Sequence, residues 1–256
     1  MIKRKTVLLL KSQNTDASSD KYEDLLTTNG FEVKKVKTLV FDFKNIQVLK
    51  EKIINNEAYE GIIFSSPRCV QAVYLALQND KNVIKAWREK YNFAVGEATY
   101  TEALNKLGLE CDGKGSGNAV NLSKVILEKK SAYRKPFLFP HGNLKTDTLN
   151  LELGKEGIEI KGVLVYDTIA NPSILKEISD VTDDLTSIPE YVVFFSPSGF
   201  HSSIDHLRKI PVDLNKVKFV AIGPVTELAI KEDNYEVYGV IKQPTPKDLL
   251  DLLSKD

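Results

Sequence analysis

The sequence is poor in the residues that usually mark a metal site or a disulfide framework, with two cysteines and three histidines among 256 residues. Cys69 and Cys111 lie far apart and match no zinc-ligand or redox spacing, so we expect two buried or idle thiols. His201 and His206 are five residues apart, a spacing that gives them no common helix face, and we interpret them as surface residues. The sequence therefore predicts no metal site.

Long hydrophobic runs and a net charge are also missing. No stretch approaches the roughly 18 consecutive apolar residues of a membrane span. The apolar run Val7 to Leu10 is closed by Lys11 and is far too short for a secretory signal. Lys and Arg total 35, as do Asp and Glu, so no overall field attracts a nucleic acid or a membrane surface. We expect a cytoplasmic protein with no nucleic-acid and no membrane partner. The sequence leaves the oligomeric state open, and we favour a monomer.

Motifs for nucleotide chemistry are absent as well. No GxGxxG follows an expected strand, and no Walker A sequence occurs. The glycine-rich stretch from Gly113 to Gly117 lacks the Lys-Ser/Thr that would mark a phosphate loop.

What the chain does contain is a series of short β-rich runs that alternate with helical patterns, an order typical of parallel sheets covered by helices. A length of 256 residues with 42% hydrophobic content allows one large domain or two of flavodoxin size, and we favour two. The expected strands are Thr6–Leu10, Gly61–Ser65, Phe93–Val95, Phe137–Phe139, Tyr191–Phe195, Phe219–Ile222 and Glu236–Val240.

Three helices carry clear boundary signals. Ser66-Pro67 supplies a natural N-cap followed by the residue best suited to the first helical position. Gly30 and Gly108 each follow a helical pattern, as expected at helix C-termini. The helix after Ser66 has one apolar stripe, formed by Val70, Val73, Tyr74 and Leu77.

An internal repeat appears when segments are compared at an offset of about 130 residues. Phe64 to Arg68 aligns well with Phe195 to Ser198, and Ala94 to Thr99 aligns with Ala221 to Thr226. The repeat predicts two similar α/β modules. The alternative is that strand-turn-helix junctions look alike in any α/β protein.

Each of these junctions is an apolar strand, a turn of Ser, Thr, Gly or Pro, and the start of a helix. Unpaired N–H groups and the helix dipole make such a start a site for anions, and parallel sheets gather these turns at one edge. Several together would hold a polyanion, although simple capping is the commoner role of any single junction. Cationic side chains at or beside strand ends are Lys11, Arg68, Lys145 and Lys218, and His141 also lies at a strand end.

With these junctions in order, the sequence resembles the uroporphyrinogen-III synthase family, closest to animal-type members, over nearly the whole chain. The segments that carry the resemblance are Gly61 to Arg68, Leu138 to Lys145, Val165 to Thr168, Phe194 to Gly199, Lys218 to Thr226 and Pro244-Thr245-Pro246. The chain departs from the family pattern at His141, where a different residue is expected, and at Lys11, which replaces an arginine common in bacterial members.

The resemblance implies an α/β fold of two flavodoxin-like parallel-sheet domains joined by a two-stranded antiparallel linker. Domain 1 would be discontinuous, comprising residues 1–36 and 171–256, and domain 2 would comprise residues 37–170. The linker strands would be at about residues 36–43 and 162–170. Two such domains facing each other would surround a ligand.

The resemblance also implies a chemistry: a cyclising hydro-lyase without a cofactor or a metal. The substrate would be hydroxymethylbilane, which is closed to uroporphyrinogen III with inversion of ring D and loss of water. Tyr166 is the candidate catalytic residue, assisting departure of the hydroxyl, with aromatic packing as its alternative role. The candidate substrate-binding residues are Ser66, Arg68, Thr99, Ser196, Ser198, Thr226, Lys11, Lys145, Lys218 and His141.

Two other classes of protein share parts of this pattern. A two-lobed, hinge-type protein could bind a small anion without catalysis, although the expected signal peptide is missing. A nucleotide-using enzyme with flavodoxin-like lobes is opposed by the missing phosphate loop. Turnover without an added cofactor distinguishes a synthase from both.

Overall fold

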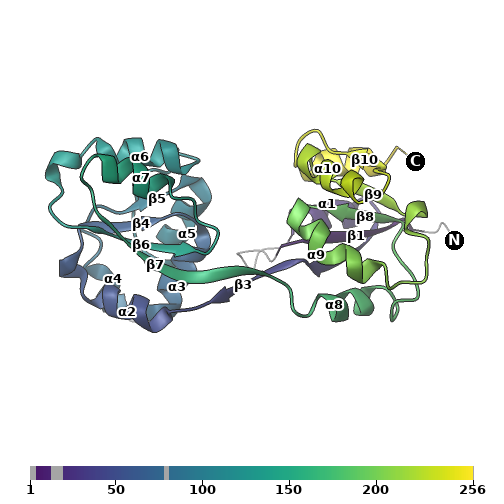
Figure 1. The fold of residues 1–256 in the computed structure, drawn as a ribbon, viewed down its shortest axis with the longest axis horizontal. Coiled ribbons are helices and arrows are strands. Elements are labelled where there is room, and N and C mark those ends of the chain that lie inside the picture. Colours follow the sequence, from purple (N-terminus) through teal and green to yellow (C-terminus); the bar gives the residue numbers. More distant parts are fainter. Residues whose placement is uncertain (1–3, 13–19, 78–80, 256) are drawn as a thin grey trace. The chain divides into compact units, whose positions relative to one another are not determined.

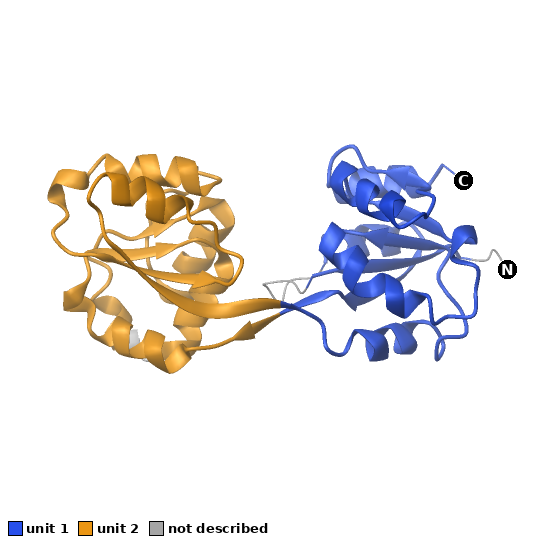
Figure 2. Cartoon of the chain, in the orientation of Figure 1, with its two compact units in different colours: residues 1–40, 169–256 blue, residues 41–168 orange. Residues whose placement is uncertain are grey.

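A computed structural model describes residues 4–12, 20–77 and 81–255 of the chain. The chain divides into two compact units (Figures 1 and 2). Unit 1 is drawn from residues 1–40 and 169–256, and unit 2 comprises residues 41–168. The two boundaries fall inside strands β3 (Leu39–Phe43) and β7 (Ile160–Ala170), so the chain passes between the units twice.

Unit 1 is built on a five-stranded sheet in the order β10-β9-β8-β1-β2, and each neighbouring pair of strands runs parallel. Its elements are β1 (Thr6–Lys11), α1 (Lys21–Thr28), β2 (Glu32–Lys37), α8 (Ile174–Val181), β8 (Tyr191–Phe194), α9 (Pro197–Leu207), a 3₁₀ turn (Leu214–Lys216), β9 (Lys218–Ala221), α10 (Pro224–Glu232), β10 (Gly239–Val240) and α11 (Pro246–Leu253).

Unit 2 has a second five-stranded sheet in the order β3-β7-β6-β4-β5, in which β7, β6, β4 and β5 pair parallel. Besides β3 and β7, its elements are α2 (Ile46–Ile54), a 3₁₀ turn (Asn56–Ala58), β4 (Gly61–Phe64), α3 (Pro67–Leu77), α4 (Lys81–Lys85), β5 (Phe93–Ala94), α5 (Gly96–Leu107), α6 (Ala119–Leu127), a second 3₁₀ turn (Lys130–Ala132), β6 (Phe137–Gly142) and α7 (Thr148–Lys155).

Helices cover both faces of each sheet, because alternate strand residues face opposite layers of apolar side chains. In β1, Leu8 and Leu10 pack with α8 and α9, whereas Val7 and Leu9 pack with α1 and α11. In unit 2, one layer contains α2, α3 and α5 and the other contains α6 and α7. The expected α/β fold with parallel sheets is therefore confirmed.

Strand β2 was not expected from the sequence. Its residues read Glu-Val-Lys-Lys-Val-Lys and lack the apolar run of a buried strand, because β2 lies at the edge of the sheet. The expected single strand at residues 36–43 is wrong in one respect. Val36 belongs to β2 and pairs with Leu10, and a bend at Thr38 separates it from β3.

Helix boundaries agree well with the expected signals. Pro67 begins α3. Helix α5 ends at Leu107 and is followed by its C-cap Gly108, whose φ of 63° is the left-handed conformation that glycine adopts without strain. The apolar stripe of α3 is buried except for Tyr74, which is 40% exposed. Both thiols, Cys69 and Cys111, are buried as expected. Among the described residues, no helix is both long enough and apolar enough to cross a membrane.

Candidate active site

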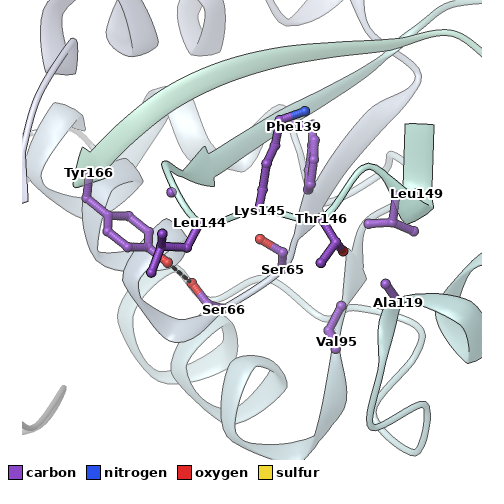
Figure 3. Close-up of a pocket in the computed structure, with 11 residues that line it drawn as sticks. Ser65, Ser66, Val95, Ala119, Phe139, Leu144, Lys145, Thr146, Leu149 and Tyr166 are labelled. Carbon is purple, nitrogen blue, oxygen red and sulfur yellow. Dashed lines mark hydrogen bonds between the residues drawn. The ribbon is translucent and has the colours of Figure 1, made fainter. Parts of the chain in front are cut away.

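A hollow of about 250 Å³ lies at the carboxyl edge of the sheet in unit 2 (Figure 3). The edge is formed where β4, β5 and β6 end and the chain turns into α3, α5 and α7. Tyr166 on β7 closes one side of the hollow. The residues that line it are Ser65, Ser66, Val95, Ala119, Phe139, Gly142, Leu144, Lys145, Thr146, Leu149 and Tyr166.

The hydroxyl of Tyr166 is joined to the start of α3. It lies 3.2 Å from Oγ of Ser66, the residue immediately before the first residue of that helix. Oγ of Ser66 also lies 3.3 Å from the buried thiol of Cys69. Ser66 thus connects the tyrosine on β7 to the helix that follows β4, and the two candidates from distant parts of the sequence meet at one point.

Gly142, the last residue of β6, provides the space that the Tyr166 ring occupies. A Cβ atom at position 142 would lie 2.5 Å from Cζ and 2.8 Å from the hydroxyl oxygen of Tyr166. The pairing of β6 with β7 shifts at this point: His141 pairs with Leu164, and Gly142 pairs with Tyr166. The extra residue on β7 is a bulge of the kind that often re-aims a side chain next to a site.

Burial raises the pKa of the Tyr166 hydroxyl above its ordinary value. The hydrogen bond with Ser66 and the charge of Arg68 act in the opposite direction but do not reverse the shift. Since an ordinary tyrosine already titrates near pH 10, Tyr166 keeps its proton at neutral pH. The residue is thus a hydrogen-bond donor at the edge of the hollow.

Arg68 lies in the first turn of α3, beside Tyr166, and is partly buried. Its Cζ atom is 3.4 Å from the centroid of the Phe41 ring, so the guanidinium stacks on that ring. Burial lowers the pKa of Arg68, although an arginine remains charged at any physiological pH. Arg68 is not among the residues that line the hollow, but its charge acts on the neutral hydroxyl of Tyr166 from the start of α3.

The loop between β6 and α7 supplies a second cation. Lys145 lines the hollow, and its Nζ lies 3.3 Å from a carboxylate oxygen of the exposed Asp147. His141 precedes this loop, packs against Phe139 with ring centroids 5.6 Å apart, and contacts the backbone oxygen of Gly142 through Nδ1 at 3.0 Å. Burial lowers the pKa of His141, so the imidazole is neutral at pH 7. His141 is not among the residues that line the hollow.

In unit 1, the start of α9 is capped by its own serine. Oγ of Ser196 accepts a hydrogen bond from the N–H of Gly199 at 3.0 Å and lies 3.2 Å from Oγ of the exposed Ser198. The start of α10 has Gly223 as its N-cap and no side-chain cap. Both helix starts lie at the carboxyl edge of the sheet of unit 1, where β8 and β9 end.

Two of the expected lysines have structural partners. Lys11, at the end of β1, forms a 2.7 Å ion pair with the buried Asp20 and lies 4.8 Å from the centroids of the Tyr22 and Phe195 rings. Lys218 is the first residue of β9 and therefore lies at the amino edge of the sheet, where it pairs with Glu190 at 3.1 Å. The expectation that Lys218 binds substrate does not fit this position, because ligands of parallel sheets bind at the opposite edge.

Thr99 and Thr226 follow the junctions as expected, but their side chains are packed inward. Thr99 in α5 is 2% exposed and Thr226 in α10 is 3% exposed. Any anion bound at these helix starts would meet backbone N–H groups rather than the two hydroxyls. Within residues 4–12, 20–77 and 81–255, no group of three or more His, Cys, Asp or Glu side chains could hold a metal ion.

Sequence reasoning missed several residues of the site. Gly142, Leu144 and Thr146 lie in or next to the segment from Leu138 to Lys145 that carries the family resemblance, and this segment was the available signal. Phe41 lies in the β-rich run that was expected to be a linker, and nothing in that run indicated a contact with Arg68.

Comparison with known proteins settles the family. The profile of uroporphyrinogen-III synthase HemD matches residues 20–251. The chain belongs to the uroporphyrinogen-III synthase family. The uroporphyrinogen-III synthase of Saccharomyces cerevisiae is 24% identical over 280 residues, covering 99% of this chain and 98% of the yeast protein.

Two solved structures show the family fold. The uroporphyrinogen-III synthetase of Helicobacter pylori 26695 matches with a TM-score of 0.62 at 16% identity, over 98% of this chain and 99% of that protein. A mutant uroporphyrinogen III synthase of the extremely thermophilic bacterium Thermus thermophilus matches with a TM-score of 0.54 at 13% identity, over 98% of this chain and 100% of that protein.

Proposed function

We propose that this chain performs the family's reaction at the carboxyl edges of its two sheets, with Tyr166 assisting the chemical step. As a uroporphyrinogen-III synthase of haem biosynthesis, it cyclises hydroxymethylbilane with loss of water. The observation that supports the assignment of the site most directly is the hydrogen bond between the hydroxyls of Tyr166 and Ser66 at the rim of the hollow in unit 2.

The main task of the protein in this reaction is to orient the substrate, and electronic activation is the smaller part. Loss of the hydroxyl from the linear tetrapyrrole leaves a cation that the adjacent pyrrole nitrogen stabilises, so the substrate itself carries much of the electronic demand. Closure without guidance gives the isomer in which ring D is not inverted. Holding the two ends of the substrate for attack at the substituted position of ring D is catalysis by orientation, and the conformation that is held selects the product.

Tyr166 is suited to assist the departure of the hydroxyl. Because its pKa is raised, the phenol is protonated at neutral pH and can donate a hydrogen bond to the leaving oxygen. Oγ of Ser66 can accept or donate toward the phenol oxygen and so fixes its direction. The nearby guanidinium of Arg68 favours negative charge that develops on the phenol oxygen as the hydroxyl departs.

The substrate carries eight carboxylates, and the site offers cations and helix starts for them. The hollow of about 250 Å³ is smaller than the roughly 300–1,000 Å³ of pockets that enclose drug-sized ligands, so it would take only part of the tetrapyrrole. The starts of α3 and α5, with Arg68 and Lys145, would meet the carboxylates on that part. Leu144 is 73% exposed and offers an apolar surface to a pyrrole ring.

Unit 1 would bind further carboxylates at the starts of α9 and α10. Ser196, Ser198 and the backbone after Gly223 are the candidate donors. Lys11 would contribute only if its ion pair with Asp20 opened, so we give it a structural role instead. His141 is proposed to support the β6–α7 loop through its contact with Gly142 rather than to bind substrate.

The two strands that pass between the units are proposed to be an antiparallel linker. The N–H of Lys44 donates to the oxygen of Val165 at 2.9 Å, and the N–H of Asn171 donates to the oxygen of Thr38 at 3.0 Å. Residue numbers rise on β3 as they fall on β7, which is antiparallel pairing. We place the domain boundaries within these strands, and we propose a cytoplasmic monomer that needs no cofactor.

The experiment is an isomer assay on the purified chain. Freshly generated hydroxymethylbilane is supplied without a cofactor, the products are oxidised, and uroporphyrins I and III are separated by chromatography. We expect predominantly type III from the wild type, a rate reduced about 10- to 100-fold in Tyr166→Phe, and a wild-type rate in Tyr74→Phe. Tyr74 is an exposed residue of α3 and serves as the matched control.

The outcomes separate the proposal from its rival. Type I alone, formed at the uncatalysed rate, would contradict a synthase and favour a protein that only binds anions. Type III at an unchanged rate in Tyr166→Phe would preserve the function and remove Tyr166 from the mechanism.

A further inference from the structure

We propose that Phe41 is a positioning residue of this synthase, whose ring holds the guanidinium of Arg68 beside Tyr166. The inference rests on the proposed function of Arg68 and Tyr166 and adds a third residue that touches neither the hollow nor the reacting atoms. Phe41 lies on β3, more than twenty positions before Arg68 and more than a hundred before Tyr166. All three residues belong to unit 2.

Two contacts on one ring support this role. The guanidinium carbon of Arg68 lies 3.4 Å from the centroid of the Phe41 ring. The same ring meets the ring of Tyr166 edge-on, with centroids 5.9 Å apart and planes at 82°. Phe41 is therefore in contact with both groups that the proposed mechanism uses, and moving its ring would move the cation relative to the phenol.

The physical reason for such a support lies in the arginine side chain. An arginine side chain loses rotamer entropy when one geometry is selected. A flat aromatic face restricts the guanidinium to a plane before substrate binds, so less of that entropy remains to be lost on binding. Stacking also compensates for part of the hydration that Arg68 loses through burial, which is the main cause of its lowered pKa.

The location of Arg68 makes orientation important. It occupies the first turn of α3, where the helix dipole disfavours a cation. A carboxylate bound between the guanidinium and the helix start would accept hydrogen bonds from both. The Phe41 ring keeps the guanidinium at this place, and the substrate carboxylate then finds two donors already arranged.

Phe43 provides a matched control on the same strand. It also contacts Tyr166, with ring centroids 6.3 Å apart at 63°, and it packs against the core of unit 2. Among the described residues, the arginine stacks on Phe41 and not on Phe43. Leucine at either position retains an apolar side chain. Only the substitution at position 41 removes the aromatic ring on which the guanidinium of Arg68 stacks.

The test is a double-mutant cycle on the full chain with hydroxymethylbilane as substrate. KM, kcat and the ratio of type III to type I product are measured for Phe41→Leu, Phe43→Leu, Arg68→Gln and the double variant Phe41→Leu/Arg68→Gln. Phe41→Trp tests rescue, since tryptophan offers the best face for a cation. Melting temperatures are measured for all variants. They distinguish a variant that is destabilised from a folded variant in which the guanidinium of Arg68 is displaced.

We expect Phe41→Leu to raise KM about 2- to 30-fold, the range of a cation–π contact from an exposed to a desolvated setting. The increase should fall below twofold in the Arg68→Gln background, and Phe41→Trp should restore most of the wild-type KM. Phe43→Leu should change KM less than twofold. The fraction of type I product should rise in Phe41→Leu, because a less firmly bound substrate dissociates and then cyclises without the enzyme.

The inference is overturned if Phe41→Leu and Phe43→Leu raise KM equally, or if the effect of Phe41→Leu persists in the Arg68→Gln background. Both results would mean that Phe41 acts through packing alone. A wild type that forms only type I would instead overturn the proposed function and, with it, any role of Phe41 in the reaction.

Discussion

The hydroxyl of Tyr166 and the hydroxyl of Ser66 lie 3.2 Å apart, although 100 positions separate the two residues in the chain. Tyr166 comes from a strand that passes between the two units, and Ser66 comes from the turn before α3. The contact joins the phenol of Tyr166 to the helix start at which we propose that a substrate carboxylate binds. It is the centre of the proposed site, and its consequences can be tested.

Replacing Ser66 by alanine should lower kcat about 2- to 10-fold with little change in fold, because one hydrogen bond contributes about 0.5–1.5 kcal/mol. The pKa of Tyr166 should rise further, since the Ser66 hydrogen bond lowers it. The pH dependence of kcat and the isomer ratio measure both effects. Ser123→Ala is the control, since that hydroxyl donates to a carbonyl within α6, away from the hollow. An unchanged kcat in Ser66→Ala would argue that Ser66 does not orient the phenol.

Replacing Gly142 by alanine should displace the Tyr166 ring, because the new Cβ would lie 2.5 Å from its Cζ atom. We expect activity to fall at least about tenfold and the free energy of unfolding to drop by about 1–3 kcal/mol, as in overpacked cores. Gly154→Ala is the control, since no atom lies within 4 Å of its added Cβ. Chemical denaturation and the isomer assay distinguish the two variants. Full activity in Gly142→Ala would show that the position of Tyr166 is not critical.

Replacing Asp20 by asparagine should test the structural role assigned to Lys11. The amide oxygen can still cap α1, where Asp20 accepts from the N–H of Tyr22 at 3.0 Å, but the ion pair with Lys11 is lost. Burial of Asp20 acts to raise its pKa, but the hydrogen bond and charge of Lys11 lower it below 3.8 overall. We expect the free energy of unfolding of Asp20→Asn to be about 1.5–3 kcal/mol lower than that of the wild type at neutral pH, which is typical of the loss of a hydrogen bond to a charged group.

The pH dependence of this loss has a definite sign. A carboxylate whose folded pKa is depressed contributes stability above its unfolded pKa and loses it as the pH falls through the folded value. The wild type should therefore exceed Asp20→Asn in stability at pH 7, and the difference should shrink below pH 3.8. Denaturant titrations at about pH 7 and about pH 3 measure it. Equal stability at pH 7 would return Lys11 to the candidates for substrate binding.

Local patterns predicted much of the fold because they report local physics. Buried parallel strands such as β1, β4 and β8 are continuous apolar runs, and the proline and glycine signals at α3 and α5 reflect fixed backbone preferences. The sequence pattern did not predict strand β2, because an edge strand with one solvated face needs few apolar residues. The pattern also did not predict the bend at Thr38, because β-rich residues continue on both sides of it.

For the candidate site too, some features follow from neighbouring residues in the sequence and others only from the tertiary structure. The sequence by itself determined the helix starts at Ser66 and Ser196 and the family to which the chain belongs, since each depends on residues that are neighbours in the chain. Only the tertiary structure decided that Lys218 lies at the amino edge of its sheet and that Lys11 forms an ion pair with Asp20. It also decided that Gly142 makes room for Tyr166 and that Phe41 lies beneath Arg68. These relationships depend on which strands are neighbours and on which face a side chain emerges, and long-range packing of the sheet sets both.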